Sequence, residues 1–202
     1  KAGVTEYLKG YRIIDAMSDI EYYKSGVIEM PVPSIRVTDA FKEVNVKPLW
    51  TYYCITAGSH FSNRFFCYHS YQNRILGTQL YKYDVDGFLH WGYNFYNTQY
   101  SKKRINPYIV TDAGRAFSSG DAFSVYPGDD CCVESLRLVV FHECLQDMRA
   151  LELLSSLIGR EETENLIDEV AGMKVDLANY PKNAAFILAL RKRVNETIKS
   201  KI

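Results

Sequence analysis

The sequence predicts an α/β domain in which parallel strands are joined by helices, followed by a helical C-terminal extension. Short strand-like runs alternate with helix-like segments, and this alternation recurs about every 35 residues, as in parallel sheets with helical crossovers. After residue 134 the pattern becomes wholly helical. We therefore assign residues 1–158 to the α/β part and residues 159–202 to the extension.

Four short runs rich in β-branched and aromatic residues are the predicted strands: 11–14, 27–32, 49–55 and 87–95. Helices are expected between them, at about 38–44, where Thr38 is a possible cap, and at 70–83, where apolar residues recur at helical spacing. Because strands linked by single helices are usually neighbours, we expect the four runs to lie side by side in parallel.

The clearest helix of the chain begins at Glu134 or Ser135 and ends at Gly159. It carries a continuous apolar stripe: Leu138, Phe141, Leu145, Met148, Leu151, Leu154 and Ile158. Such a stripe predicts packing on the outer side of the strands. Two further helices are expected at about 161–171 and 183–199.

A long loop is predicted at residues 98–120, which are rich in Ser, Lys, Asn, Pro and Gly and show little periodicity. Loops of this length in compact domains are usually lids or binding loops. Residues 121–126 look like a short extended return, and the Pro-Gly-Asp-Asp sequence at 127–130 is typical of a turn.

Composition narrows the classes of partner and cofactor. The chain holds 24 basic and 24 acidic residues, and this balance gives no reason to expect nucleic acid as a partner. No apolar run reaches the roughly 18 residues of a membrane span, so no membrane partner is expected. Five cysteines without a C-x-x-C motif favour reduced thiols, and reduced thiols slightly favour a cytoplasmic location. The four histidines lack metal-ligand spacing, so we expect no metal and no cofactor.

The segment 87–97 is the most aromatic in the chain and the strongest candidate for a site. Trp91, Tyr93, Asn94 and Tyr96 offer flat rings and polar tips just where the predicted strand ends. The C-terminal ends of parallel strands are where α/β folds place ligands. Aromatic clusters also fill cores, and both interpretations stand at this point.

Other candidates come from the remaining strands and one loop. Asp15 directly follows the first strand, although a helix N-terminal carboxylate is an equally good interpretation. In the third strand, side chains alternate, so either Trp50 and Tyr52 or their neighbours face the open side of the sheet. Asn63 and Arg64 lie in the loop that follows and are candidates to reach into a site.

Several blocks carry a resemblance to a known family: LWTYYC (49–54), NRILG (73–77), GFLHWGYN (87–94), GDAFSVYPG (120–128) and SLR (135–137). From about Tyr11 to about Leu154 the chain resembles the C-terminal part of bacterial proteins that carry the domain of unknown function 4091, the catalytic-domain type of glycoside hydrolase family 123. The resemblance implies a (β/α)-barrel that acts on glycans, with N-acetylgalactosaminide hydrolysis as the characterised activity. The block order implies that this chain holds only the C-terminal half of a TIM-like barrel. The missing N-terminal half of the same protein, or a second copy of the chain, is then an expected partner.

The family's catalytic residues are not found here. The resemblance implies an adjacent Asp and Glu after an earlier strand, with the substrate's acetamido group as nucleophile and the Glu as acid. In this chain Asp-Glu occurs only at Asp168-Glu169, inside the helical tail. Asp129-Asp130 lies in the predicted turn, where Asp serves turn chemistry. The catalytic residues are therefore left unassigned.

Sugars present an apolar C–H face and a rim of hydroxyls, so they suit flat aromatics flanked by amides, carboxylates and guanidinium groups. The predicted substrate-binding residues are Asp15, Trp50, Tyr52, Asn63, Arg64, Trp91, Tyr93, Asn94 and Tyr96. Two functions follow from these observations. The first is a part of a glycoside hydrolase-like protein that acts on N-acetylhexosamine-containing glycans and supplies the walls of the substrate site. The second is a non-catalytic carbohydrate-binding or scaffolding protein on the same fold.

Overall fold

The computed structural model describes residues 6–202, and its first half is a βα repeat. The strands are β1 (Ile14–Asp15), β2 (Met30–Pro31), β3 (Trp50–Tyr52) and β4 (Gly87–Leu89). The helices between them are α2 (Glu21–Lys24), α3 (Thr38–Glu43), and the pair α4 (Ser70–Arg74) and α5 (Leu76–Tyr83). β1 pairs in parallel with β2, β3 pairs in parallel with β4, and a parallel bridge joins Ser34 to Tyr52. The predicted parallel arrangement of neighbouring strands is confirmed.

The strands are shorter than the apolar runs predicted, and prolines explain part of the difference. Pro31 and Pro33 have no N–H to donate, so the ladder between β2 and β3 cannot run continuously. It is reduced to the single bridge at Ser34, where Tyr52 N donates to Pro33 O at 3.0 Å and Ile35 N donates to Tyr52 O at 2.8 Å. The strand order is therefore clear although each ladder is brief.

Alternation along β3 decides which side chains face the helices. Thr51 and Tyr53 are both fully buried, and Tyr53 packs in a hydrophobic cluster with Leu76 and Leu80 of α5. Because successive strand residues point to opposite faces, Trp50 and Tyr52 lie on the face away from α5. Both are half-buried. Of the two alternating sets of side chains on β3, the one that contains Trp50 and Tyr52 thus lies on the open side of the strands.

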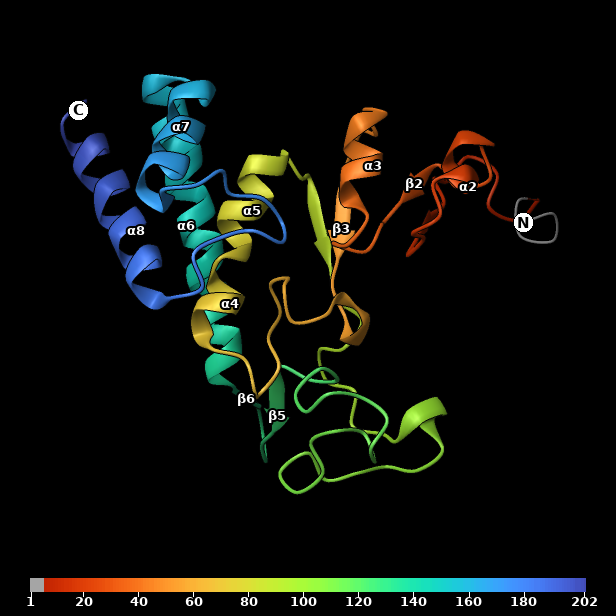
Figure 1. Ribbon diagram of the computed structural model, residues 1–202. Coiled ribbons are helices and arrows are strands. Elements are labelled where there is room, and N and C mark those ends of the chain that lie inside the picture. The colour runs from red at the N-terminus through yellow and green to blue at the C-terminus, as the bar shows by residue number, and fades with distance from the viewer. Residues whose placement is uncertain (1–5) are drawn as a thin grey trace.

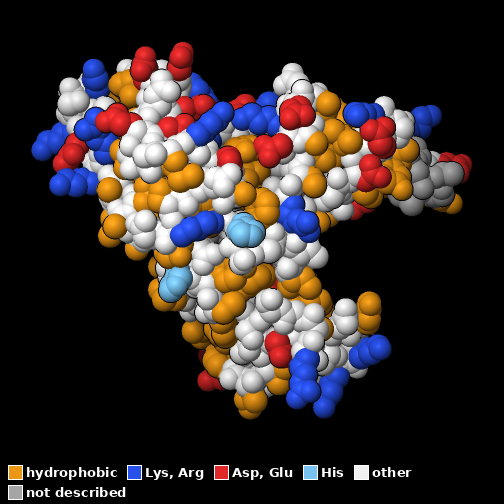
Figure 2. Space-filling model, viewed as in Figure 1, with side chains coloured by type: hydrophobic (Ala, Val, Ile, Leu, Met, Phe, Trp, Pro, Cys, Tyr) orange, Lys and Arg blue, Asp and Glu red, His pale blue; other side chains and the backbone are white. Residues whose placement is uncertain are grey.

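After β4 the chain forms a lobe with little regular structure. It contains the short 3-10 helix η2 (Gln99–Ser101) and ends in an antiparallel hairpin of β5 (Val125–Pro127) and β6 (Cys132–Glu134). Gly128 N donates to Cys131 O at 2.8 Å and closes the turn, so the predicted turn at 127–130 is confirmed. Figure 1 shows this lobe extending away from the helices, and Figure 2 shows a deep notch between it and the N-terminal arm that carries α2 and β2.

The long helix α6 (Leu136–Ile158) has the start and end that the sequence predicts. Ser135 caps it, accepting from Leu138 N at 3.3 Å, and Gly159 ends it at a positive φ of 93°. The helix packs mainly against α4 and α5 rather than directly on the strands. The contact with α5 is close: a Cβ on Gly77 would lie 1.9 Å from a backbone oxygen of Cys144. α6 reaches β4 through Phe141, whose ring centroid lies 5.8 Å from that of Phe88.

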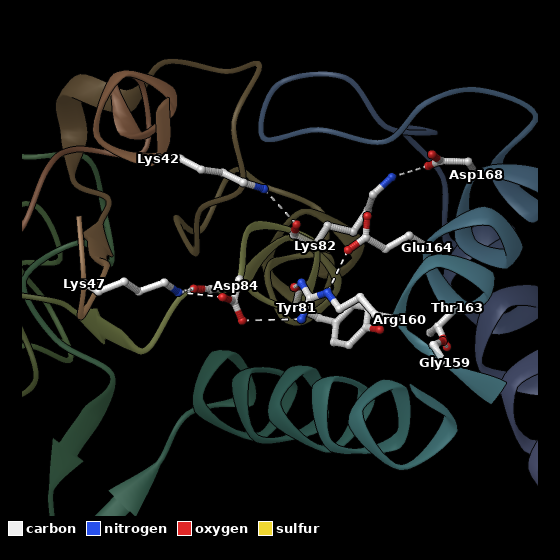
Figure 3. Close-up of polar contacts among 10 residues, drawn as sticks. All are labelled: Lys42, Lys47, Tyr81, Lys82, Asp84, Gly159, Arg160, Thr163, Glu164 and Asp168. Atoms are coloured by element: carbon white, nitrogen blue, oxygen red, sulfur yellow. Dashed lines mark hydrogen bonds and ion pairs between the residues drawn. The ribbon is translucent and has the colours of Figure 1, made fainter. Parts of the chain in front are cut away.

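The C-terminal extension consists of α7 (Arg160–Ala171) and α8 (Ala184–Lys199), and it shares a hydrophobic core with the helices before it. That cluster joins Ile75, Tyr81 and Leu151 to Leu166 and Ile187. Polar contacts fix the same interface, as Figure 3 shows. Lys82 of α5 donates to Asp168 of α7, and Arg160 donates to Tyr81 O while pairing with Glu164 at 2.8 Å.

The four parallel strands do not close on themselves within the described residues. In residues 6–202 no helix is both long and apolar enough to cross a membrane. The five cysteines, all inside this range, are free, and burial raises the pKa of the Cys144 thiol to about 12.

Candidate functional site

Trp91 follows β4 by two residues and is the best-fixed exposed aromatic side chain in this region. Its indole Nε1 donates to Oδ2 of Asp121 at 3.1 Å, and 40% of the residue is exposed. The rings of Phe117 and Phe95 pack against the indole at steep angles, and their centroids lie 4.8 and 5.4 Å from the centroid of the indole. A flat ring whose plane is fixed and whose surface is accessible is suited to stacking on another flat or C–H-rich face.

A buried polar network lies behind Trp91. His90 Nδ1 lies 2.6 Å from Arg64 Nη2 and accepts from Gly92 N at 3.0 Å. Nδ1 also lies 3.2 Å from Gly92 O, but its two shorter contacts are with donors, so we take Nδ1 as the acceptor and assign the ring proton to Nε2, which lies 3.3 Å from Asp121 Oδ1. Asp121 thus accepts a hydrogen bond from Trp91 through Oδ2, while its Oδ1 and His90 Nε2 lie close together without a hydrogen bond between them.

Burial sets the charge state of this network. Desolvation lowers the pKa of His90 despite the opposing effect of Asp121, so the imidazole is neutral at pH 7. Burial also lowers the pKa of the Arg64 guanidinium, which stays charged and donates to Gly92 O at 2.8 Å. The backbone at Gly92 also lies close to the backbone at Asp121, because a Cβ on Gly92 would lie 2.6 Å from Asp121 O.

Asn63 and Arg64 were expected to reach into the site, and the structure shows both residues buried. Arg64 is only 5% exposed and Asn63 is fully buried. Asn63 Nδ2 donates to Cys54 O at 3.1 Å, and its Oδ1 accepts from Arg64 N at 2.8 Å. Asn63 thus fixes the loop after β3 from within, and Arg64 holds that loop against the segment that carries Trp91. They support the site from behind.

Three further residues predicted from the same segment have different surroundings. Tyr93 and Asn94 are exposed beside Trp91, with 51% of Tyr93 accessible, and both are free to contact a ligand. Tyr96 is held by its hydroxyl, which donates to Val125 O at 2.8 Å. It therefore ties this segment to the hairpin strand β5.

The remaining predicted residues lie on the other strands. The indole of Trp50 on β3 lies against Gly87 of β4, and Tyr52 shares its face. Asp15 is exposed in β1, which the pairing places at the opposite end of the order β1-β2-β3-β4. The structure therefore brings the Trp50 and Trp91 segments onto adjacent strands, with Asp15 farther along the sheet.

Sequence reasoning missed the two residues that position Trp91. His90 was considered only among the histidines that lack metal-ligand spacing, and Asp121 only as the start of an extended return. The Asp121 contact spans 30 positions, so no local pattern indicates it. In the part of the chain that the structure describes, no group of three or more His, Cys, Asp or Glu side chains could hold a metal ion.

Comparison with protein families finds a match for residues 1–154 of the chain. The family model described as "Glycoside hydrolase 123, catalytic domain" matches residues 1–154, which include all the strands and most of α6. No curated protein matches the chain.

Proposed function

Because this chain belongs to glycoside hydrolase family 123, we propose that it acts on N-acetylhexosamine-containing glycans and supplies the aromatic and polar walls of their binding site. The family match gives the general function, that of a glycoside hydrolase-like domain. The sugar and the wall residues are the part that we propose.

The observation that carries the proposal is the exposed, fixed indole of Trp91. Its N–H is engaged by a buried carboxylate, so the exposed part of the ring, and not the N–H, is what we propose that a ligand contacts. A sugar ring stacked on that face would find the Tyr93 hydroxyl and the Asn94 amide at its rim, where sugar hydroxyls and an acetamido group form hydrogen bonds. Trp50 and Tyr52 would extend the wall over the neighbouring strand, and Asp15 would close it.

The acid that cleaves the bond is proposed to lie outside this chain. Asp168 accepts from Lys82 and from Val175 N at 2.8 Å, so the Asp-Glu dipeptide of α7 serves the interface with α5. We propose that strands absent from this chain complete the barrel next to β1 and β4, supplied by the rest of the same protein or by a second copy. Exposed edges of parallel sheets are costly to leave open. Light scattering of the isolated chain should then show self-association, and a clean monomer would count against this part of the proposal.

Glycan binding by the isolated chain is the direct test. Calorimetric titration with an N-acetylgalactosamine-terminated oligosaccharide should show binding that Trp91→Ala weakens by at least about tenfold. Asp121→Leu should weaken it as well, because the indole loses its anchor. Tyr100→Ala is the matched control, since Tyr100 is 78% exposed in the same lobe and has no role in the proposed wall. Equal losses in Trp91→Ala and Tyr100→Ala would reject the proposed site.

A further inference from the structure

A cleft lies beside Arg64, which also contacts the segment that carries Trp91. Its volume is about 600 Å³, and its walls come from residues 63–70, the start of α4, the hairpin β5–β6 and the first turn of α6. Figure 1 shows the beginnings of α4 and α6 side by side next to this hairpin. Arg64 lines the cleft and also donates to Gly92 O, so it forms the partition between the cleft and the Trp91 site.

The cleft contains positive charge that no carboxylate contacts directly. Arg137 donates through Nη1 to Gly120 O at 2.7 Å and to Phe123 O at 2.8 Å, while its Nη2 is buried without a hydrogen-bond partner. Arg64 Nε is likewise buried without a partner. Among residues 6–202, neither guanidinium forms a direct ion pair with an Asp or Glu side chain, and the buried carboxylate of Asp121 acts on Arg64 from the far side of His90. Buried charges in proteins are normally paired with an opposite charge, and Arg137 has backbone oxygens and aromatic rings beside it instead.

The beginning of α6 adds to this positive potential. The helix is 23 residues long, and the positive end of its dipole points to the cleft. Its first turn carries no acidic residue and instead carries Arg137, against the usual preference of helix N-termini for negative side chains. Glu134 is the single acidic side chain among the lining residues and is exposed. One solvated carboxylate is a weak counter-charge for two buried guanidinium groups and a helix end.

The other walls are aromatic. Tyr108 stacks on Tyr126 with centroids 4.9 Å apart, and the guanidinium of Arg137 lies 4.7 Å from the ring centre of Phe66. Tyr68 lines the opposite side. Flat aromatic walls beside a cationic end suit a ring that carries a negative group.

We propose that this cleft binds an anionic oxygen group, a sulfate ester or a carboxylate, carried by an acidic glycan. This inference rests on the proposed function for the identity of the carrier, because the partition formed by Arg64 places the cleft next to the Trp91 wall. The glycan's neutral N-acetylhexosamine would lie on Trp91 and its acidic group, or an adjoining acidic unit, in the cleft. The anion site itself stands on the charges and walls described above.

Inorganic sulfate is the first probe, titrated into the chain at constant ionic strength with sodium chloride as the exchanged salt. Sulfate should bind, and Arg137→Gln should weaken sulfate binding by about tenfold or more.

Since Arg137 also donates to two backbone oxygens, a second variant leaves Arg137 in place. Leu136→Glu puts a carboxylate at a 72% exposed position in the first turn of α6, where it favours the helix and occupies the anion's place. It should abolish sulfate binding, whereas Leu153→Glu, the same change at an exposed position elsewhere on α6, should not. Equal sulfate affinity in Leu136→Glu and Leu153→Glu would overturn the anion site.

The second pair of probes separates a glycan-borne anion from a free one. N-acetylgalactosamine 6-sulfate should bind more tightly than N-acetylgalactosamine, and Leu136→Glu should remove that advantage while Trp91→Ala weakens both sugars alike. Equal binding of the two sugars to the unmodified chain would reject the glycan as the carrier. Binding of neither sugar, with sulfate binding still sensitive to Leu136→Glu, would reject the proposed function and support the anion site alone.

Discussion

Gly87 of β4 lies so close to Trp50 of β3 that a Cβ at Gly87 would come within 2.1 Å of indole Cε2. The absence of a side chain on one strand is therefore what allows the indole to lie flat over its neighbour. Gly87→Ala must displace the ring, and we expect it to destabilise the chain by about 1–3 kcal/mol, as overpacking does. Urea unfolding measures this loss.

The displacement of Trp50 can be observed by itself. The chain has two tryptophans, so a Trp91→Phe background leaves Trp50 as the single indole. In that background Gly87→Ala should shift the fluorescence maximum of the native chain to longer wavelength, because the displaced ring becomes more exposed. An unchanged emission spectrum would show that the packing of Trp50 on Gly87 does not hold the ring.

His90 should make stability depend on pH. Its folded pKa is lowered from 6.5, mainly by burial, whereas the unfolded chain takes up a proton near 6.5. The unfolded state therefore binds more protons below pH 6.5, so the stabilisation is complete above that value and is lost as the pH falls below it. In His90→Asn, the Asn Oδ1 can accept from Arg64 and Gly92 as Nδ1 of His90 does. The part of the pH dependence of the unfolding free energy that His90 causes should then vanish.

The measurement is the free energy of unfolding at several pH values above and below 6.5. His142→Asn is the control, because His142 is exposed on α6 and its replacement should leave the slope of the native chain unchanged. A slope in His90→Asn that equals the wild-type slope would show that His90 is not held neutral by its surroundings.

The interface between α5 and α7 offers a comparison of two adjacent acids. Lys82, with a side chain 6% exposed, depends on Asp168, which also accepts from Val175 N. Asp168→Ala would leave a buried ammonium unpaired, and we expect a loss of about 2 kcal/mol, reduced from the value for a fully buried pair because Asp168 is partly exposed. Glu169→Ala removes only a surface contact to Arg193 at 3.6 Å and should change stability very little. Thermal unfolding of the two variants gives the comparison, and similar losses would contradict this account of the interface.

Local signals predicted the helices and the strand order well. Ser135 and Gly159 indicate both ends of α6, and the apolar runs that became β3 and β4 indicate two adjacent parallel strands. The strand lengths were overestimated, because an apolar run does not show that a proline such as Pro33 removes a ladder donor. The family itself was recognised from short blocks, and the family-model match over residues 1–154 confirms it.

The candidate site was predicted in part. Trp91 was predicted because a strand end rich in rings is a local pattern, and its role at a site stays a prediction. Asp121, which holds it, lies 30 positions away, and the burial of Arg64 depends on a contact 26 positions away with His90. Contacts at such separations follow from how the lobe folds back on β4. They leave no periodic pattern in the sequence, and this is why Arg64 was expected at the ligand instead of behind it.

The most direct test of the central claim is an assay of the isolated chain with a chromogenic N-acetylgalactosaminide, run beside a binding titration of the same compound. Cleavage needs a proton donor at the leaving oxygen and a group that stabilises the developing positive charge, and each contributes orders of magnitude in rate. The account predicts binding that depends on Trp91 and no measurable hydrolysis by this chain, with hydrolysis appearing once the barrel is completed. Hydrolysis by the isolated chain that is lost in Asp15→Asn, Asp129→Asn or Asp130→Asn would contradict it and identify that carboxylate as the acid. Binding without hydrolysis in the completed protein would instead make this a carbohydrate-binding member of the fold.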